Sequence, residues 1–408
     1  MTIRTTARRA IALLAFASAL LPAAPAAARE RVERVVMVMR HGVRAPLGGE
    51  VPDGTLTAAS WPEWPVAPEQ MTPHGLRSMA IRGAADRVWL AGLGVLPARG
   101  CPAAGAVSIW TNVSQRTIDS GKAFADGFAP GCNLAIGHRA SGEVDPLFEA
   151  LRADTTGFDP VQAIASINAY TGGMDRLVQR HAAALKDLDH ILGCKQPTCS
   201  PGPAAAVKPS RDGHGIDLEG PIRRTSGIAQ VLLLQYAEGM PARDVGWGRA
   251  DAASIARVGA LHAALFDVFT RPPYMAAHQA GPLGRRIIAS LTAPTGPSLD
   301  LLVGHDTNVT ALAAALRLDL TAPGYAPGDT APAGALVLER LYDDATNSRS
   351  VRLSYRTQSP TTIRTSASTV STTNLPIPGC TKARQTRCPL DAFVKTLAAR
   401  LADERIGN

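Results

Sequence analysis

Short apolar runs, each followed by polar residues and then by a helical pattern, recur along the chain. The run RVVMVM at residues 34–39 is rich in β-branched side chains and is bounded by polar residues, which predicts a buried strand. AVSIW at 106–110 and LDLLVG at 299–304 are two further strand candidates, and a helical pattern follows both. This repeated order of strand, turn and helix predicts an α/β fold with a mostly parallel central sheet flanked by helices.

Helical patterns dominate the middle of the chain. Between residues 153 and 270 the strand patterns vanish, and segments such as DRLVQRHAAALKDLDHIL and TSGIAQVLLLQYAEGM have apolar residues at helical spacing. We therefore predict a helical insertion domain at 153–270, placed between two parts, 29–152 and 271–408, of a single α/β domain.

Capping and turn residues predict further local structure. Thr72 as N-cap and Pro73 at the first helical position predict the start of a helix. A stretch rich in Pro, Gly and Ser at 195–215 predicts an exposed loop. The Ser- and Thr-rich stretch at 357–373 alternates weakly, and it predicts strands and turns.

Residues 1–28 have the pattern of an export signal. Three arginines precede an apolar stretch at 11–21, and the alanines at 26–28 offer a cleavage site. We expect no later stretch to supply the roughly 20 apolar residues that a membrane span needs. The mature chain is therefore expected to be periplasmic or secreted, with no membrane partner.

Charge excludes one class of partner. The formal net charge is +8, and removal of the three signal arginines leaves +5. The basic residues are scattered, without the run or stripe that nucleic-acid binding requires, so we expect no nucleic-acid partner.

The six cysteines form three pairs of near neighbours along the chain. Six thiols allow 15 pairings, and the sequence cannot choose among them. An exported chain meets an oxidising compartment, so local disulfides are the default expectation. No histidine or second C-x-x-C lies near CKQPTC to complete a four-ligand metal site, so we expect no metal. The neighbours are Cys101 with Cys132, Cys194 with Cys199, and Cys380 with Cys388.

Chemically distinctive side chains follow the three predicted strands. In an open parallel sheet, ligands bind beyond the carboxyl ends of the strands. A cation in the first turn of a helix opposes the helix dipole and therefore implies a bound anion, and guanidinium groups match the oxygens of phosphate. The side chains are Arg40, His41 and Arg44 after the first strand, Arg116 after the second, and His305 and Asp306 after the third.

The same residues predict a reaction. Cations near His41 depress the pKa of its imidazole, so that it stays neutral and can attack phosphorus as a nucleophile. Asp306 is the candidate acid for protonating the leaving alkoxide, and it could then activate water. The chain has no phosphate loop of the G-x-x-x-x-G-K-[ST] type, no G-x-S-x-G motif and no H-E-x-x-H motif. Most of the other histidines, at positions 74, 138, 181, 190, 214, 262 and 278, are interpreted as surface or packing residues.

The motifs RHGVRAP and GHDTN resemble the histidine acid phosphatase family, in particular its bacterial periplasmic phytases and glucose-1-phosphatases. The resemblance runs from about residue 34 to 393. It implies an acid phosphatase fold of the phosphoglycerate-mutase-like type, a phosphohistidine mechanism, the three local disulfides and no cofactor. It further implies that His41 is the nucleophile and Asp306 the proton donor, and that substrate is bound by Arg40, Arg44, Arg116, His305 and Thr307.

Departures from the family pattern concern the substrate. Phytases of this kind tend to carry a Thr-Lys pair where Leu47 and Gly48 stand here, Gln230 stands where they have an acidic residue, and His74 replaces a common arginine. We expect a monomeric, exported acid phosphatase with phytate as the leading substrate and glucose 1-phosphate or another sugar phosphate as the alternative. A non-catalytic phosphate scavenger is the alternative from another class, although Asp306 would only weaken anion binding in such a protein.

Overall fold

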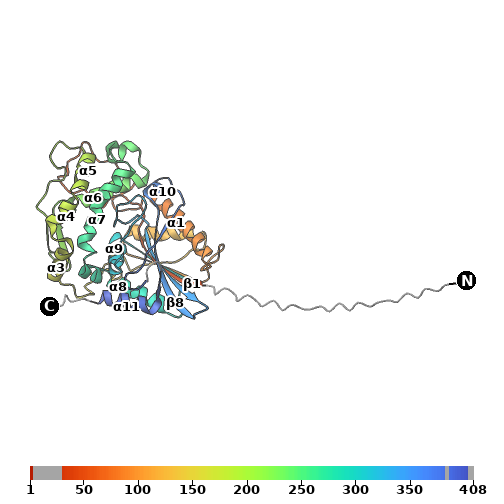
Figure 1. Ribbon diagram of the computed structural model, residues 1–408. Helices are drawn as coiled ribbons and strands as arrows, with labels where there is room; N and C mark the ends of the chain where they lie inside the picture. The colour runs from red at the N-terminus through yellow and green to blue at the C-terminus, as the bar shows by residue number, and fades with distance from the viewer. Residues whose placement is uncertain (3–29, 382–385, 403–408) are drawn as a thin grey trace.

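The computed structural model in Figure 1 describes residues 1–2, 30–381 and 386–402. The predicted export signal therefore lies outside the described residues, except for its first two positions. Within the described part, a central sheet has the strand order β10-β8-β7-β1-β6-β2-β3, and β9 pairs with β8. The strands are β1 (Glu30–Arg40), β2 (Val107–Thr111), β3 (Ile136–Gly137), β6 (Leu299–Gly304), β7 (Ala335–Asp343), β8 (Ser348–Thr357), β9 (Ser371–Asn374) and β10 (Arg387–Pro389).

The α/β class is confirmed, and the sheet is mixed rather than mostly parallel. The half that carries the predicted strands is parallel, because β6 pairs in parallel with both β1 and β2, and β2 pairs in parallel with β3. The other half is antiparallel: β7 pairs with β1 and with β8, and β8 pairs with β9 and β10. A short turn joins β7 to β8, and antiparallel strands need no longer connection than that.

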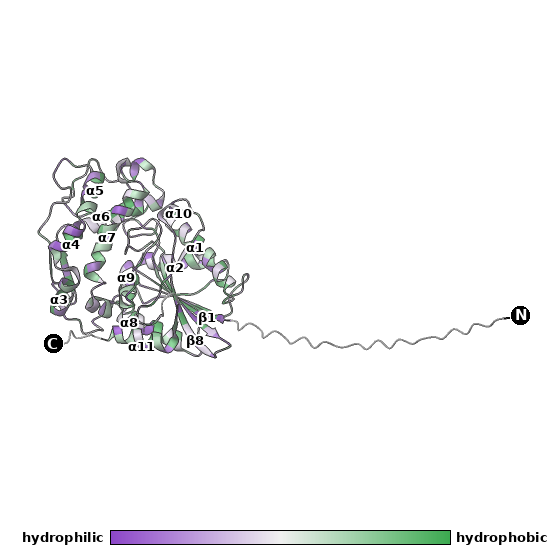
Figure 2. Cartoon of the chain, viewed as in Figure 1, coloured by the Kyte–Doolittle hydropathy of each residue, from purple (hydrophilic) through white to green (hydrophobic). Residues whose placement is uncertain are grey.

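Both faces of the sheet are covered by helices. Alternate residues of β1 point to opposite faces, so Val35, Met37 and Met39 join one apolar cluster while Val36 and Val38 join another. Figure 2 shows the hydrophobic positions along these central strands. The first cluster is completed by α1 (Pro73–Gly92) and α2 (Gln115–Phe128), and the second by α8 (Pro273–Thr292), α9 (Asp306–Ala315) and α11 (Leu390–Leu401).

A separate apolar cluster lies among the helices of the middle segment, to one side of the sheet in Figure 1. The predominance of helices there agrees with the sequence pattern, while the domain boundaries at 153 and 270 stay a prediction. One of these helices, α7, is long and apolar enough to cross a membrane, contrary to our expectation, but 56% of its residues are buried and it packs against α5 and α6. The helices are α3 (Pro160–Thr171), α4 (Met174–Arg180), α5 (Ala182–Leu192), α6 (Pro221–Glu238) and α7 (Ala252–Phe269).

Two local predictions need correction. The stretch at 195–215 is not entirely loop, because β4 (Ala206–Pro209) pairs with β5 (Ile216–Glu219) in an antiparallel hairpin. The stretch at 357–373 contains a short helix, α10 (Pro360–Arg364), which begins with Ser359 as N-cap.

The remaining local predictions are confirmed. The Thr72 hydroxyl accepts a hydrogen bond from the N–H of Gly75 at 2.9 Å, and Pro73 is the first residue of α1. All six cysteines form disulfides between near neighbours, with Cα atoms 5.4 to 5.7 Å apart. The pairs are Cys101–Cys132, Cys194–Cys199 and Cys380–Cys388.

Candidate active site

The carboxyl ends of three neighbouring parallel strands bring the predicted side chains together. Arg40 at the end of β1 pairs in register with Gly304 at the end of β6, and Thr111 at the end of β2 lies beside Val303. His41, which directly follows β1, donates its backbone N–H to the Gly304 carbonyl oxygen at 3.0 Å. A Cβ at Gly304 would lie 2.5 Å from the Asn308 Oδ1 atom, so the close approach of strand and helix requires glycine there.

His41 is held as a neutral imidazole whose proton is on Nδ1. Its Nδ1 lies 2.9 Å from the Gly42 carbonyl oxygen, and because a carbonyl can only accept, the proton of the neutral ring resides on Nδ1. Burial, followed by the guanidinium groups of Arg44 and Arg40, holds the pKa of His41 well below 6.5. Its Nε2 atom therefore keeps a lone pair at mildly acidic pH.

Asp306 is the first residue of α9, and it faces Arg40. The Arg40 Nη2 atom lies 2.9 Å from the Asp306 Oδ2 atom, and Oδ1 accepts the backbone N–H of Thr307 at 2.8 Å. Burial raises the pKa of Asp306, but the opposing effects of Arg40, His262 and His305 are larger together, so the net pKa lies below 3.8. Asp306 is thus ionised while it remains paired with Arg40.

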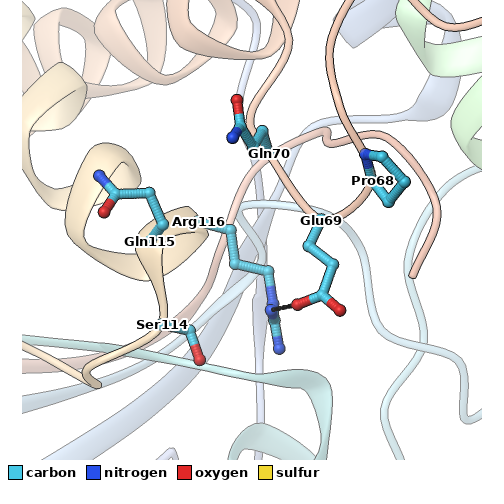
Figure 3. A pocket seen from close by; sticks show the side chains of 6 residues that line it. All are labelled: Pro68, Glu69, Gln70, Ser114, Gln115 and Arg116. Carbon is cyan, nitrogen blue, oxygen red and sulfur yellow. Dashed lines mark hydrogen bonds and ion pairs between the residues drawn. The ribbon is translucent and has the colours of Figure 1, made fainter. Parts of the chain in front are cut away.

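The two other arginines are also paired with carboxylates, neither of which the sequence patterns identified. Glu50 accepts from Arg44 through both oxygens, at 3.0 and 2.6 Å, and from the backbone N–H of Leu47 at 2.8 Å. Arg116 lies in the first turn of α2, and its Nη1 is 3.3 Å from the Glu69 Oε2 atom (Figure 3). Each of the three guanidiniums therefore has one carboxylate partner.

The ion pairs do not use all the hydrogen-bond donors of the three guanidinium groups. The Nε atoms of Arg40, Arg44 and Arg116 are buried, and none has a hydrogen-bond partner among the described residues. Burial, with Arg44 next, lowers the pKa of Arg116, so its charged form is disfavoured in the site despite the nearby carboxylates. Buried guanidinium donors without partners are costly unless an anion satisfies them. This arrangement can bind a tetrahedral oxyanion.

His305 is positioned by two asparagines. As N-cap of α9 it donates its backbone N–H to the Asn308 Oδ1 atom at 2.8 Å, and its Nε2 lies 3.1 Å from the Asn112 Oδ1 atom. Burial and Arg116 lower the pKa of His305 to about 3. The His41 and His305 rings lie edge to face with centroids 5.6 Å apart. His305 is thus a neutral imidazole beside His41.

One histidine that we interpreted as a packing residue lies in the site. His262, on α7, places its Nε2 3.7 Å from the Asp306 Oδ2 atom, and its Nδ1 lies 2.7 Å from the Asp329 Oδ1 atom. Asp329 is buried and also accepts the backbone N–H of Thr330. An isolated histidine within a helical pattern carries no signal of such a role, because its partners lie 44 and 67 positions away in the chain.

The described residues contain no candidate metal site, and two residues that depart from the family pattern, Gln230 and His74, are buried. Among residues 1–2, 30–381 and 386–402, no group of three or more His, Cys, Asp or Glu side chains could hold a metal ion. Gln230, on α6, is buried, and neither atom of its amide has a hydrogen-bond partner in the described part of the chain. His74 is buried and contacts the Ile363 carbonyl oxygen at 2.9 Å.

Comparison with known proteins decides the family. The sequence model of the histidine phosphatase superfamily (branch 2) matches residues 31–174. The phytase AppA of Escherichia coli is 31% identical over 94% of this chain and 96% of its own length. The chain belongs to this superfamily. It is accordingly a phosphomonoester hydrolase of the histidine acid phosphatase type, which overturns the alternative of a non-catalytic scavenger.

Other relatives agree with this assignment. The glucose-1-phosphatase of Salmonella typhimurium is 27% identical over 89% of this chain and 91% of its own length. The structure of Hafnia alvei phytase in complex with tartrate superimposes with a TM-score of 0.85 at 31% identity, covering 93% of this chain and 98% of that one. A complex of the same phytase with myo-inositol hexakis sulphate gives a TM-score of 0.81. The histidine acid phosphatase fold is thus confirmed.

Proposed function

We propose that His41 is the nucleophile of this phosphatase and that Asp306 is its proton donor. The observation that carries the proposal is a neutral histidine close to three arginines, Arg40, Arg44 and Arg116. The Nε donors of these arginines are buried and have no partner within the described part of the chain. The His41 Nε2 atom attacks phosphorus, the ester P–O bond breaks, and the leaving alkoxide takes the proton of Asp306. Water then attacks the phosphohistidine, Asp306 takes its proton, and phosphate leaves with the P–N bond broken.

The ion pair between Arg40 and Asp306 belongs to the substrate-free site. A bound phosphate dianion competes for the Arg40 guanidinium and places negative charge beside Asp306. Both changes raise the pKa of that carboxyl group, because a nearby anion disfavours ionisation. Substrate therefore brings about the protonation of its own general acid. His305 and Thr307, at the start of α9, complete the proposed substrate contacts.

Phytate is the leading substrate in our proposal. The phytase relatives support it through their identity and through structural similarity over nearly the whole chain. Glucose 1-phosphate is the second candidate, and a specific observation favours it: Leu47 and Gly48 begin a turn that ends in Glu50, so this loop presents a carboxylate and no cation to Arg44. A substrate with one phosphate needs fewer cations than phytate.

We also propose that the protein is exported, either to the periplasm or into the medium, and acts as a monomer without nucleic-acid or membrane partners. The three disulfides support the compartment, since disulfides persist where the environment is oxidising. The pattern of residues 1–28 supports the export itself.

Replacement of the nucleophile tests the mechanism. The variant His41→Ala should reduce phosphate release from an aryl phosphate at mildly acidic pH to background, because it lacks the ring nitrogen that forms the covalent intermediate in the proposed mechanism. The matched control is His138→Ala: this exposed histidine has the same contact between Nδ1 and the carbonyl oxygen of the following residue, at 2.7 Å. Undiminished turnover by His41→Ala would refute the proposed mechanism.

The same assay, run with wild-type enzyme on phytate and on glucose 1-phosphate, ranks the two substrates. A higher kcat/KM on phytate supports the phytase proposal. A higher kcat/KM on glucose 1-phosphate supports the second candidate and associates the Leu47–Glu50 turn with a preference for small substrates.

A further inference from the structure

Glu69, whose carboxylate pairs with Arg116, has an unfavourable backbone conformation. Glu69 has a φ of 71°, in the left-handed region that non-glycine residues seldom adopt. Hydrogen bonds hold the backbone there: the Glu69 N–H donates to the Pro46 carbonyl oxygen at 3.0 Å, and the Ala45 N–H donates to that of Gln70 at 2.9 Å. Such conformations persist where the surroundings impose them, and they concentrate at functional sites.

This segment forms a pocket with the start of α2. Figure 3 shows Pro68, Glu69 and Gln70 on one side and Ser114, Gln115 and Arg116 on the other. The pocket has a volume of about 320 Å³. Glu69 points across it toward Arg116, so a substrate group that lies beyond the phosphate bound to Arg116 encounters the Glu69 carboxylate.

The Glu69 side chain is more exposed to solvent than the carboxylates that pair with Arg40 and Arg44. The Glu69 side chain is 56% exposed, whereas that of Glu50 is 12% exposed and is held by both Arg44 and the Leu47 N–H. One substrate phosphate can displace Glu69 from Arg116 into solvent. The displaced carboxylate remains within reach of the pocket, and it repels any further anion that is bound there.

From these observations we propose that Glu69 is a specificity-determining residue, which lowers catalytic efficiency on densely phosphorylated substrates relative to substrates with a single phosphate. The inference rests on the proposed phosphatase function. Its physical basis is repulsion between like charges. The other phosphates of phytate bring negative charge close to Glu69, whereas the hydroxyl groups of glucose 1-phosphate do not.

Two variants separate charge from shape. Glu69→Gln removes the charge and keeps the side-chain length, and Glu69→Gly removes the whole side chain at a backbone conformation that glycine adopts freely. The control is Asp344→Asn, because Asp344 is a carboxylate of similar exposure, 54%, that pairs with Arg31 near the start of β1, at the end of that strand remote from the site. The measurement is kcat/KM on phytate and on glucose 1-phosphate, at one mildly acidic pH for all variants.

Both Glu69 variants should raise the ratio of kcat/KM on phytate to that on glucose 1-phosphate by about 3- to 10-fold, the range expected for one partly screened charge pair. Asp344→Asn should leave the ratio unchanged. An unchanged ratio in the Glu69 variants would overturn the inference. Equal losses on both substrates would also overturn it, because Glu69 would then only orient Arg116. A rise in Glu69→Gly alone would assign selectivity to shape and refute the role of charge.

The failure of the proposed function would look different. If wild-type enzyme released no phosphate from either substrate, the phosphatase proposal itself would be wrong. A change of ratio in an active enzyme concerns only Glu69.

Discussion

At the scale of single residues, the site is an array of compensated charges around two neutral histidines. Each of Arg40, Arg44 and Arg116 has one carboxylate partner, and the pKa values of His41 and His305 are both lowered. Burial, together with the neighbouring Arg44 and Arg40, thus disfavours protonation of His41, the proposed nucleophile. In the proposed mechanism, a phosphate dianion replaces Asp306 beside Arg40 and Glu69 beside Arg116.

The pH dependence of kcat follows from two of these residues. The pKa of His41 is lowered, so its neutral form is complete at mildly acidic pH and is lost as pH falls through that pKa. Asp306 must be protonated to act as acid, and this form is lost as pH rises through its pKa in the substrate complex. We therefore expect a bell-shaped profile of kcat on an aryl phosphate, with its maximum in the acidic range.

Asp306→Asn provides the control for this assignment. It should lower kcat by ~10²- to 10⁴-fold, as removal of a general acid does, while inhibition by inorganic phosphate remains. A flat wild-type profile, or a variant that keeps full turnover, would contradict the assigned roles.

At the scale of elements, a buried ion network connects α1 to the sheet and to Ala333, which bonds to the backbone of His41. The Asp86 carboxylate accepts from Arg82 at 2.8 Å and from Arg356 of β8 at 2.7 Å, and all three side chains are buried. Arg82 also donates to the Ala333 carbonyl oxygen at 2.7 Å, and the Ala333 N–H donates to that of His41 at 3.1 Å. The network therefore supports the backbone of the active site.

Removal of the shared carboxylate should destabilise the fold. Asp86→Ala leaves two buried guanidiniums without their partner, which costs about 3–5 kcal/mol of the free energy of unfolding. Urea denaturation followed by circular dichroism measures this. Asp187→Ala, which removes the partner of Arg257 from an exposed ion pair, should cost no more than ~1 kcal/mol. Equal effects of the two variants would refute the importance of the network.

At the scale of the whole molecule, the disulfides constrain the chain locally. Cys101 and Cys132 are 31 positions apart, while Cys194 and Cys199 are 5 apart. In the loop-entropy account, a disulfide stabilises by restricting the unfolded chain, and the restriction grows with loop length.

Removing each of these disulfides should therefore have different effects. The double replacement of Cys101 and Cys132 by serine should lower the free energy of unfolding by about 3–4 kcal/mol, against ~2 kcal/mol for Cys194 and Cys199. Urea denaturation under oxidising conditions gives both values. Phosphatase activity below the unfolding transition should persist in both variants, because no cysteine belongs to the proposed site. The reverse order of stabilities would contradict the entropic account.

Several features of the fold and of the candidate site can be predicted from local sequence patterns. The alternation of β1, the cap of α1 and the two motifs at strand ends depend on residues close together in the chain, so they can be interpreted without a structure. The second strand of the hairpin at 206–219 could also have been predicted, because Ile216 and Leu218 alternate with polar residues as in a half-buried strand. The Pro, Gly and Ser residues around it obscured that signal.

The antiparallel half of the sheet and the partners of the proposed catalytic and binding residues became evident only in the tertiary structure. Glu69 meets Arg116 from 47 positions away, and His262 comes to Asp306 from a helix outside the sheet. Nothing local distinguishes these side chains from solvated or packed ones. Their surroundings depend on burial and charge, which arise only when distant segments meet. Local motifs were therefore enough to predict the reaction, whereas the tertiary structure was needed to identify the groups that lower the pKa values of His41 and Asp306.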